Sequence, residues 1–176
     1  MGVSVLLWPL LALLACWLVG VHARLKRLRN ACWLAVDALD RGLQALLLVA
    51  KEALDRPNPA TKAHEVLTVA ALQLSLCLKT MKSAKLMTGR DDEALALSAQ
   101  WSEMASAWEL FCGVHQDIIE AQALQELRSA WDETHNHALF AKTTANQAMQ
   151  DYNAALQQAP AAWVAGRMGF VPATPL

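Results

Sequence analysis

Proline and glycine are scarce in this chain, with 6 prolines and 7 glycines among 176 residues. Alanine and leucine dominate instead, and both are strong helix formers. Because the residues that break helices and build tight turns are few, the composition favours long helices over a sheet. We therefore expect an all-α protein.

Sequence motifs for common chemistry are also missing. The chain has no glycine-rich phosphate loop, no G-x-S-x-G turn and no Glu-x-x-His pair of the kind found in di-iron bundles. His135 and His137 would point about 200° apart on a helix, so they cannot share a metal ion. We expect no catalytic residue, no cofactor and no metal site. A metal-dependent or hydrolytic enzyme tethered to a membrane is the alternative, which the missing ligand sets disfavour.

No two of the 4 cysteines form a Cys-x-x-Cys pair, and Cys16 lies inside an apolar run. The chain therefore lacks a disulfide framework. Scattered thiols suit core positions in a reducing compartment, which favours the cytoplasm.

A coherent excess of positive charge is absent, since the net charge is −1. Residues 1–90 nevertheless hold 12 Lys and Arg against 5 Asp and Glu, whereas residues 91–176 hold 3 against 11. This asymmetry predicts that the two halves pack on each other with opposite charge. The overall balance argues against binding to nucleic acid.

Residues 3–21 are the one long stretch without any charged side chain. As a helix, this stretch would span about 28 Å, close to the hydrocarbon thickness of a bilayer. Basic residues follow it and none precedes it. By the positive-inside rule, we expect a single-pass anchor in the inner (plasma) membrane, with the N-terminus outside and the bulk of the chain in the cytoplasm.

Two other interpretations of this stretch were weighed. A cleaved signal peptide would need a basic start and a small-residue cleavage site, but the run ends in a poor site at residues 20–23. An outward-facing envelope lipoprotein is suggested by residues 13–16, which end in Cys16. The apolar run continues beyond that cysteine, where a lipoprotein would become polar. A retained anchor fits the sequence best.

Four helices are predicted downstream, at about 24–54, 61–88, 91–112 and 121–159, followed by a tail at 161–176. The first and last carry apolar residues at alternating spacings of three and four, as in a coiled coil. Thr61 is the expected cap of the second helix. The middle of the last helix is rich in alanine, so a neighbouring helix can approach closely there. Short turns predict an antiparallel up-down four-helix bundle.

The direction of each predicted helix returns a second group of basic residues to the membrane end of the bundle. The expected membrane-proximal basic residues are Arg24, Lys26, Arg27, Arg29, Lys79, Lys82, Lys85 and Arg90. The tail from Trp163 to Phe170 arrives at the same end, so we expect it to contact the membrane interface. Asn146 and Asn153 lie seven residues apart beside the apolar seam. They either fix helix register by buried hydrogen bonds or form a docking face.

Residues near both ends of the soluble part resemble the signatures of the LemA family. The residues that carry the likeness are Asn30, Trp33, Asp37, Thr134, Asn136, Asn146, Tyr152, Asn153, Pro160, Gly169 and Phe170. His135 stands where the family has Glu, so the chain is similar to a divergent member. The resemblance implies a single-pass membrane protein with a cytoplasmic helical bundle, and one branch of the family takes part in building magnetosome membranes. It carries over no catalytic residue. We therefore expect a non-enzymatic scaffold or interaction protein whose partners are membrane lipid and other membrane or cytoplasmic proteins, with homo-oligomers left open.

Overall fold

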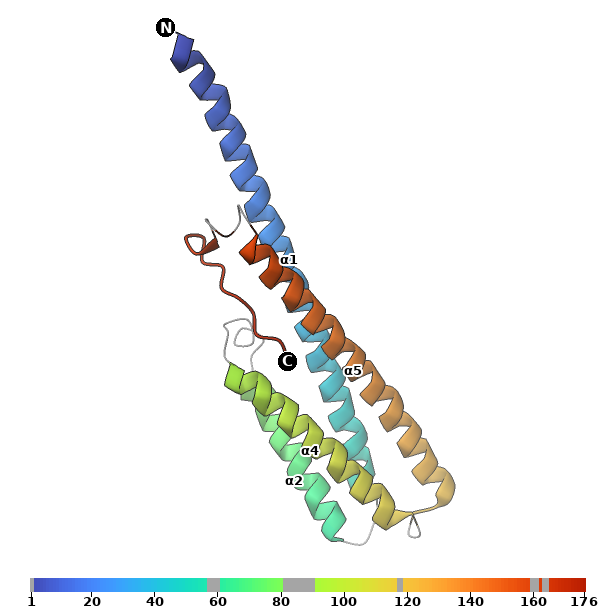
Figure 1. Ribbon diagram of the computed structural model, residues 1–176. Helices are drawn as coiled ribbons and strands as arrows, with labels where there is room; N and C mark the ends of the chain where they lie inside the picture. The colour runs from blue at the N-terminus through green and yellow to red at the C-terminus, as the bar shows by residue number, and fades with distance from the viewer. Residues whose placement is uncertain (1, 57–60, 81–90, 117–118, 159–161, 163–164) are drawn as a thin grey trace.

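The computed structural model describes residues 2–56, 61–80, 91–116, 119–158, 162 and 165–176. These residues form four α-helices, and they include no strand. The helices are α1 (Gly2–Asp55), α2 (Lys62–Thr80), α4 (Asp91–His115) and α5 (Ala121–Gln157), as Figure 1 shows. The chain is all-helical, as its composition predicts. Residues 81–88 of the predicted second helix lie outside the described ranges.

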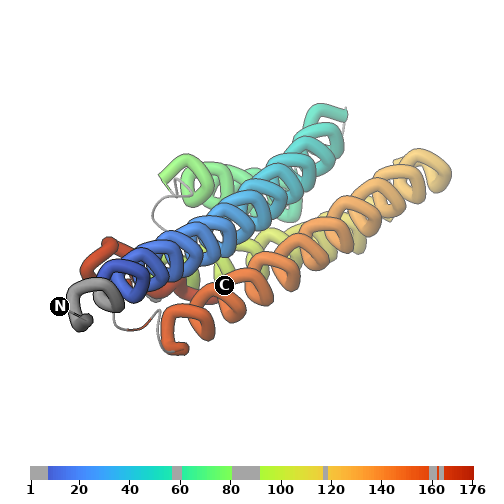
Figure 2. Tube along the Cα trace, turned by 90° about the horizontal axis from the view of Figure 1, so that it is seen from above, coloured from blue at the N-terminus to red at the C-terminus, as the bar shows by residue number. Residues whose placement is uncertain are grey.

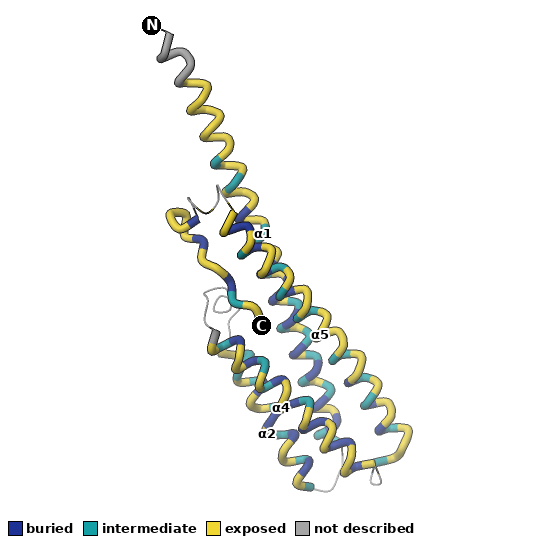
Figure 3. The backbone as a smooth tube through the Cα atoms, in the orientation of Figure 1, coloured by how far each residue is buried: buried dark blue, intermediate teal, exposed yellow. Residues whose placement is uncertain are grey.

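The longest helix, α1, has 54 residues and is about 80 Å long at 1.5 Å per residue. Its first part extends beyond the rest of the protein (Figures 1 and 3). The side chains there are apolar and exposed, as in Trp8 (76 %), Leu13 (73 %) and Val19 (68 %). From Leu25 onward, one face of the same helix is buried. One helix therefore joins an exposed apolar segment to a packed domain.

The packed part of α1 runs antiparallel to α5, and the two lie side by side along the protein (Figure 2). The Cys32 thiol donates a hydrogen bond to the Ala148 carbonyl at 3.1 Å. Further along, a Cβ atom added to Gly42 would lie 3.2 Å from the Cα atom of Ala138. The two backbones thus approach about as closely as a glycine allows. The alanine-rich middle of α5 is a close helix contact, which confirms that prediction.

A second antiparallel pair, α2 and α4, covers the half of the α1–α5 pair that is remote from the exposed apolar segment (Figure 1). We call the core of this half the distal cluster. Trp108 of α4 stacks on Trp131 of α5 there, with ring centroids 4.4 Å apart and planes at 9°. Apolar residues at spacings of three and four form the buried face of α4. They are Leu97, Trp101, Met104, Trp108 and Phe111. Both tryptophans therefore belong to the core.

The other half of the α1–α5 pair has a core of its own, which we call the near cluster. It combines residues 25–36 of α1 and 145–156 of α5 with Ala165, Phe170 and Ala173 of the C-terminal segment and with Ala94 near the start of α4. The C-terminal segment thus fills the place beside α1 and α5 that α2 and α4 fill in the distal half (Figure 1). Four helices pack together only in the distal half of the described structure.

Each helix of the basic half packs against a helix of the acidic half, α1 against α5 and α2 against α4. The halves therefore contact each other, but these contacts do not show that opposite charge holds them together. The ion pairs Arg41–Asp37 (3.1 Å) and Arg56–Glu52 (3.2 Å) each join residues one turn apart on α1. Exposed pairs of this kind contribute little to stability. The contact between the halves rests mainly on apolar packing.

The turn between α1 and α2 is tied to the end of α4 by one hydroxyl group. Thr61 caps α2, because its Oγ1 atom accepts a hydrogen bond from the His64 N–H at 3.2 Å. The same hydroxyl lies 3.2 Å from Nε2 of His115, whose Nδ1 lies 2.9 Å from the Phe111 carbonyl. This carbonyl can only accept, so Nδ1 carries the proton and Thr61 donates to Nε2. The fully buried His115 thereby has both ring nitrogens paired.

The contact between Gly42 and Ala138 gives a direct stability prediction. Ala138→Leu should lower the free energy of unfolding by about 1–3 kcal/mol, because the added atoms would meet the α1 backbone. Thermal unfolding of the full chain in detergent, followed by circular dichroism, measures the effect. Ala154→Leu is the matched control, since Ala154 is exposed on the same helix. Equal melting temperatures for the two variants would contradict the close contact.

Candidate functional site

The apolar beginning of α1 and the basic residues behind it form one candidate site. In the described residues, α1 is the only helix that is long and apolar enough to cross a membrane. Signal sequences and core helices of soluble proteins pass the same test. Only 6 % of its most apolar window is buried, which argues against a core helix.

The structure divides the basic residues predicted to lie at the membrane end. Arg24, Lys26, Arg27 and Arg29 follow the exposed apolar segment directly on α1. Lys79, by contrast, lies near Asp40 and Gln44. Asp40 is 16 residues beyond Arg24, or about 24 Å along the helix axis. The structure therefore does not place Lys79 beside Arg24, because α2 reaches only the middle of α1. Lys82, Lys85 and Arg90 lie outside the described residues.

The C-terminal tail does reach the end of the packed domain where the basic residues lie. The ring of Phe170 lies 5.6 Å from that of His22 and 5.3 Å from the guanidinium carbon of Arg29. A tight turn aims the ring there, since the Phe170 N–H donates to the Ala165 carbonyl at 3.0 Å. Gly169 has φ +71°, the left-handed conformation that this kind of turn requires. Trp163 lies outside the described residues.

Beyond Phe170, the tail turns back along α5, where three side chains bind its backbone. Asn153 accepts from the N–H of Ala173 at 2.8 Å and donates to its carbonyl at 2.7 Å. Asn146 makes the same pair of bonds to Leu176, at 2.7 Å and 2.9 Å. The Tyr152 hydroxyl donates to the Val171 carbonyl at 3.1 Å. We call these three side chains and their backbone partners the tail ladder.

The tail ladder bears on the two hypotheses for Asn146 and Asn153. Their amides bind an extended segment of the same chain, so these part-buried hydrogen bonds are structural, although they hold the tail on α5 and not one helix on another. A docking face for a partner stays a hypothesis. The sequence singled out both residues by their spacing of seven, but it contained no signal that identified the tail as their partner.

The other residues of the LemA resemblance are spread over α1 and α5. Trp33 is half-buried against the near cluster, whereas Asn30 and Asn136 are exposed. Asp37 pairs with Arg41 on the same helix. The Thr134 hydroxyl donates to the Ala130 carbonyl at 2.7 Å, a bond within α5. Pro160 lies outside the described residues. The structure thus unites only the C-terminal members of this set, in the tail ladder and the turn at Gly169.

The histidines of α5 belong to its packing or its surface. His135 lies between Trp101 (5.5 Å between ring centroids) and Trp131 (6.1 Å). His137 is exposed and lies 4.0 Å from the Glu133 carboxylate, one turn away. Among the residues that the structure describes, no three His, Cys, Asp or Glu side chains are placed to hold a metal ion together.

The three cysteines of the packed domain, Cys32, Cys77 and Cys112, are not activated nucleophiles. All four are free thiols. Burial raises the pKa of Cys32 to about 11, and burial also raises the pKa of Cys77 and of Cys112. Because the thiolate is the reactive form, these groups remain unreactive thiols at neutral pH.

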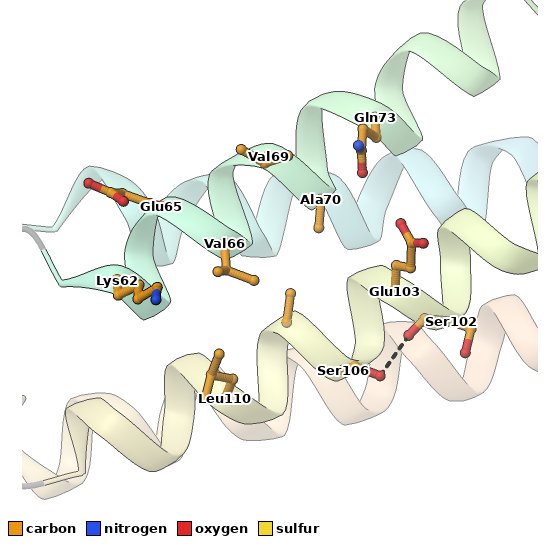
Figure 4. A pocket seen from close by; sticks show the side chains of 11 residues that line it. Lys62, Glu65, Val66, Val69, Ala70, Gln73, Ser102, Glu103, Ser106 and Leu110 are labelled. Carbon is orange, nitrogen blue, oxygen red and sulfur yellow. Dashed lines mark hydrogen bonds between the residues drawn. The ribbon is translucent and has the colours of Figure 1, made fainter.

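A shallow groove of about 600 Å³ separates the outer faces of α2 and α4 (Figure 4). Val66 and Val69 of α2 and Leu110 of α4 line it with apolar side chains that are 40–52 % exposed. Glu65 and Glu103 lie at its edges (Figure 4). Lys62, Ser102 and Ser106 also line it, so its lining combines an apolar surface with polar and charged side chains.

The tail ladder predicts a stabilising role for the asparagine amides. Asn153→Ala should lower the free energy of unfolding by about 1–3 kcal/mol, because it leaves the N–H and carbonyl of Ala173 without partners. It should also speed cleavage of the tail by carboxypeptidase. Both are measured on the full chain in detergent. Asn136→Ala, an exposed site on the same helix, is the control. If both variants behave like wild type, the tail is not held by this ladder.

Comparison with known proteins identifies no relative of this chain. No family model, no curated protein and no solved structure matches it.

Proposed function

We propose that this protein is a single-pass membrane protein whose antiparallel helical bundle acts as a non-enzymatic scaffold or interaction module. The observation that supports it most is the division of α1. Its first part exposes large apolar side chains, and its remainder is packed against α5. Exposure of such a segment to water is unfavourable, because each Å² of apolar surface that stays hydrated costs roughly 25 cal/mol of free energy. A bilayer removes that cost.

The orientation that we propose has the N-terminus outside and the packed helices in the cytoplasm of the inner membrane. Arg24, Lys26, Arg27 and Arg29 support it, since basic residues flank the apolar segment on this side alone. Each basic side chain near an anionic leaflet contributes about 1 kcal/mol of attraction. Phe170 lies beside Arg29 and is buried in the near cluster, so it ties the tail to this end of α1.

A scaffold role agrees with the polar chemistry of the packed part. Both ring nitrogens of the buried His115 are paired, and burial raises the pKa of the thiols of Cys32, Cys77 and Cys112. The likeness to LemA signatures supports the same proposal. The proposed partners are membrane lipid at the basic end of α1 and proteins at the helical surfaces.

Membrane retention tests the anchor. The paired change Leu13→Arg and Leu14→Arg should release the protein from carbonate-washed membranes, because each Arg near a helix centre costs about 2.5–3.5 kcal/mol of insertion. Leu34→Arg is the matched control, since Leu34 is as exposed (69 %) as Leu13 (73 %) but lies beyond the basic residues. Release of both variants, or of neither, would contradict an anchor confined to the apolar segment.

The orientation has its own test in fusions to the C-terminus. A fluorescent protein that folds only in the cytoplasm should be active there, and alkaline phosphatase should be inactive. Moving the basic residues, with Arg24, Lys26, Arg27 and Arg29 changed to Gln and lysines placed before Val3, should invert both signals. An active phosphatase on the wild-type chain would reverse the proposed topology.

A further inference from the structure

The end of the packed domain next to the exposed apolar segment carries cations without acids. Residues 1–36 and 152–176 contain no Asp or Glu, and these two stretches supply most of the near cluster. Their cations are Arg24, Lys26, Arg27 and Arg29 of α1 and Arg167 of the tail. Arg167 is exposed in the turn that ends at Phe170, and this turn lies beside α1 at the same end (Figure 1).

The acids closest to this end have other neighbours. Asp151 on α5 accepts a hydrogen bond from Gln147, one turn back on the same helix, at 2.9 Å. On α1, the first acid is Asp37, which pairs with Arg41. Glu93, at the start of α4, lies near Cys77 at the end of α2. The positive charge at this end of α1 is therefore not neutralised by acids of the described structure.

The fold holds the guanidinium of Arg29 in place. Its carbon lies 5.3 Å from the centre of the Phe170 ring, and the same ring packs against His22, two turns earlier on α1. The Nε atom of Arg29 is buried and has no hydrogen-bond partner among the described residues. A guanidinium in a fixed position presents its N–H groups as a planar fork, and the oxygens of a phosphate match that fork.

The position of Arg29 along α1 suits the phosphates of a bilayer. With residues 3–21 in the hydrocarbon, the Cα atom of Arg29 lies eight residues, or about 12 Å, beyond its edge. The polar headgroup layer of one leaflet is about 5–7 Å thick. Side chains on a helix lean toward its N-terminus, so the guanidinium lies several Å closer to this layer than its Cα atom does.

We propose that Arg29 and Arg167 form a binding site for the phosphodiester of an anionic lipid headgroup, with Arg29 as the fixed contact and Arg167 as the second cation. The inference rests on the proposed anchoring, which turns this end of the domain toward lipid. Zwitterionic headgroups also carry a phosphodiester, but their ammonium groups find no carboxylate at this end of the described structure. The site therefore selects lipids with a net negative charge, and the turn at Gly169 becomes a second contact of the protein with the membrane.

Binding of a short-chain phosphatidylglycerol to the full chain in neutral detergent tests the site. Wild type should bind it at least roughly tenfold more tightly than phosphatidylcholine of the same chain length. Arg29→Gln should weaken this binding at least roughly tenfold, because hydrogen bonds from a charged group to phosphate are lost. Arg29→Lys, which keeps the charge and loses the fork, should weaken it more than about threefold. Arg24→Gln is the matched control, with the same loss of charge at an exposed site, and should weaken it less than about threefold.

Arg167→Gln gives a readout that does not depend on packing at Phe170, since Arg167 is exposed. It should weaken phosphatidylglycerol binding at least roughly threefold. Inorganic phosphate at the concentration of the lipid should not displace it. Equal binding of the two lipids, equal effects of Arg29→Gln and Arg24→Gln, no effect of Arg167→Gln, or displacement by inorganic phosphate would overturn the proposal. These measurements need no insertion, so a failure of the anchor itself shows separately, as release of wild type from carbonate-washed membranes.

Discussion

The close packing of α1 on α5 is the contact on which the rest of this structure depends. At Gly42 and Ala138 the two backbones meet with almost no side chain between them. Such a contact fixes the separation, direction and register of two long helices, because larger side chains cannot be accommodated. Everything else is arranged around this pair. α2 and α4 cover one half of it, and the tail covers the other.

The apolar seam between α1 and α5 is covered by different elements in its distal half and its near half. In the distal half, α2 and α4 bury the seam with stacked rings such as Trp108 on Trp131. In the near half, the extended C-terminal segment buries the seam. Unlike a helix, an extended segment leaves its backbone N–H and carbonyl groups unpaired, so they need hydrogen-bond partners. An extended backbone cannot bond to the backbone of a helix, whose N–H and carbonyl groups are already paired. The side-chain amides of Asn146 and Asn153 supply these partners, because each amide bonds to both the N–H and the carbonyl of one tail residue.

Much of this architecture follows from the hydrophobic periodicity of the sequence and from its helix propensity. The three-four spacing of α1 and α5, the buried face of α4 and the cap at Thr61 could all be read from residues whose effect is local. Two features could not. The position of Lys79 along the axis of α1 depends on how α2 packs against α1. That is a tertiary contact, which local sequence patterns do not encode. The partner of Asn146 and Asn153 lies 20 to 30 residues away in sequence, in a proline-containing segment with no periodic pattern.

The central claim is that α1 is one helix that passes from lipid into a packed domain, and a spin label measures it directly. Cys16 lies on the exposed apolar part of α1, and Leu48 is 67 % exposed on its packed part. With the other cysteines replaced, the full chain labelled at Cys16 or at Leu48→Cys can be placed in nanodiscs. Power saturation then compares collisions with oxygen, which enters lipid, and with a water-soluble nickel complex. The account predicts that oxygen dominates at Cys16 and nickel at Leu48. A label at Cys16 that nickel reaches freely, or that is lost with a cleaved N-terminal segment, would contradict it.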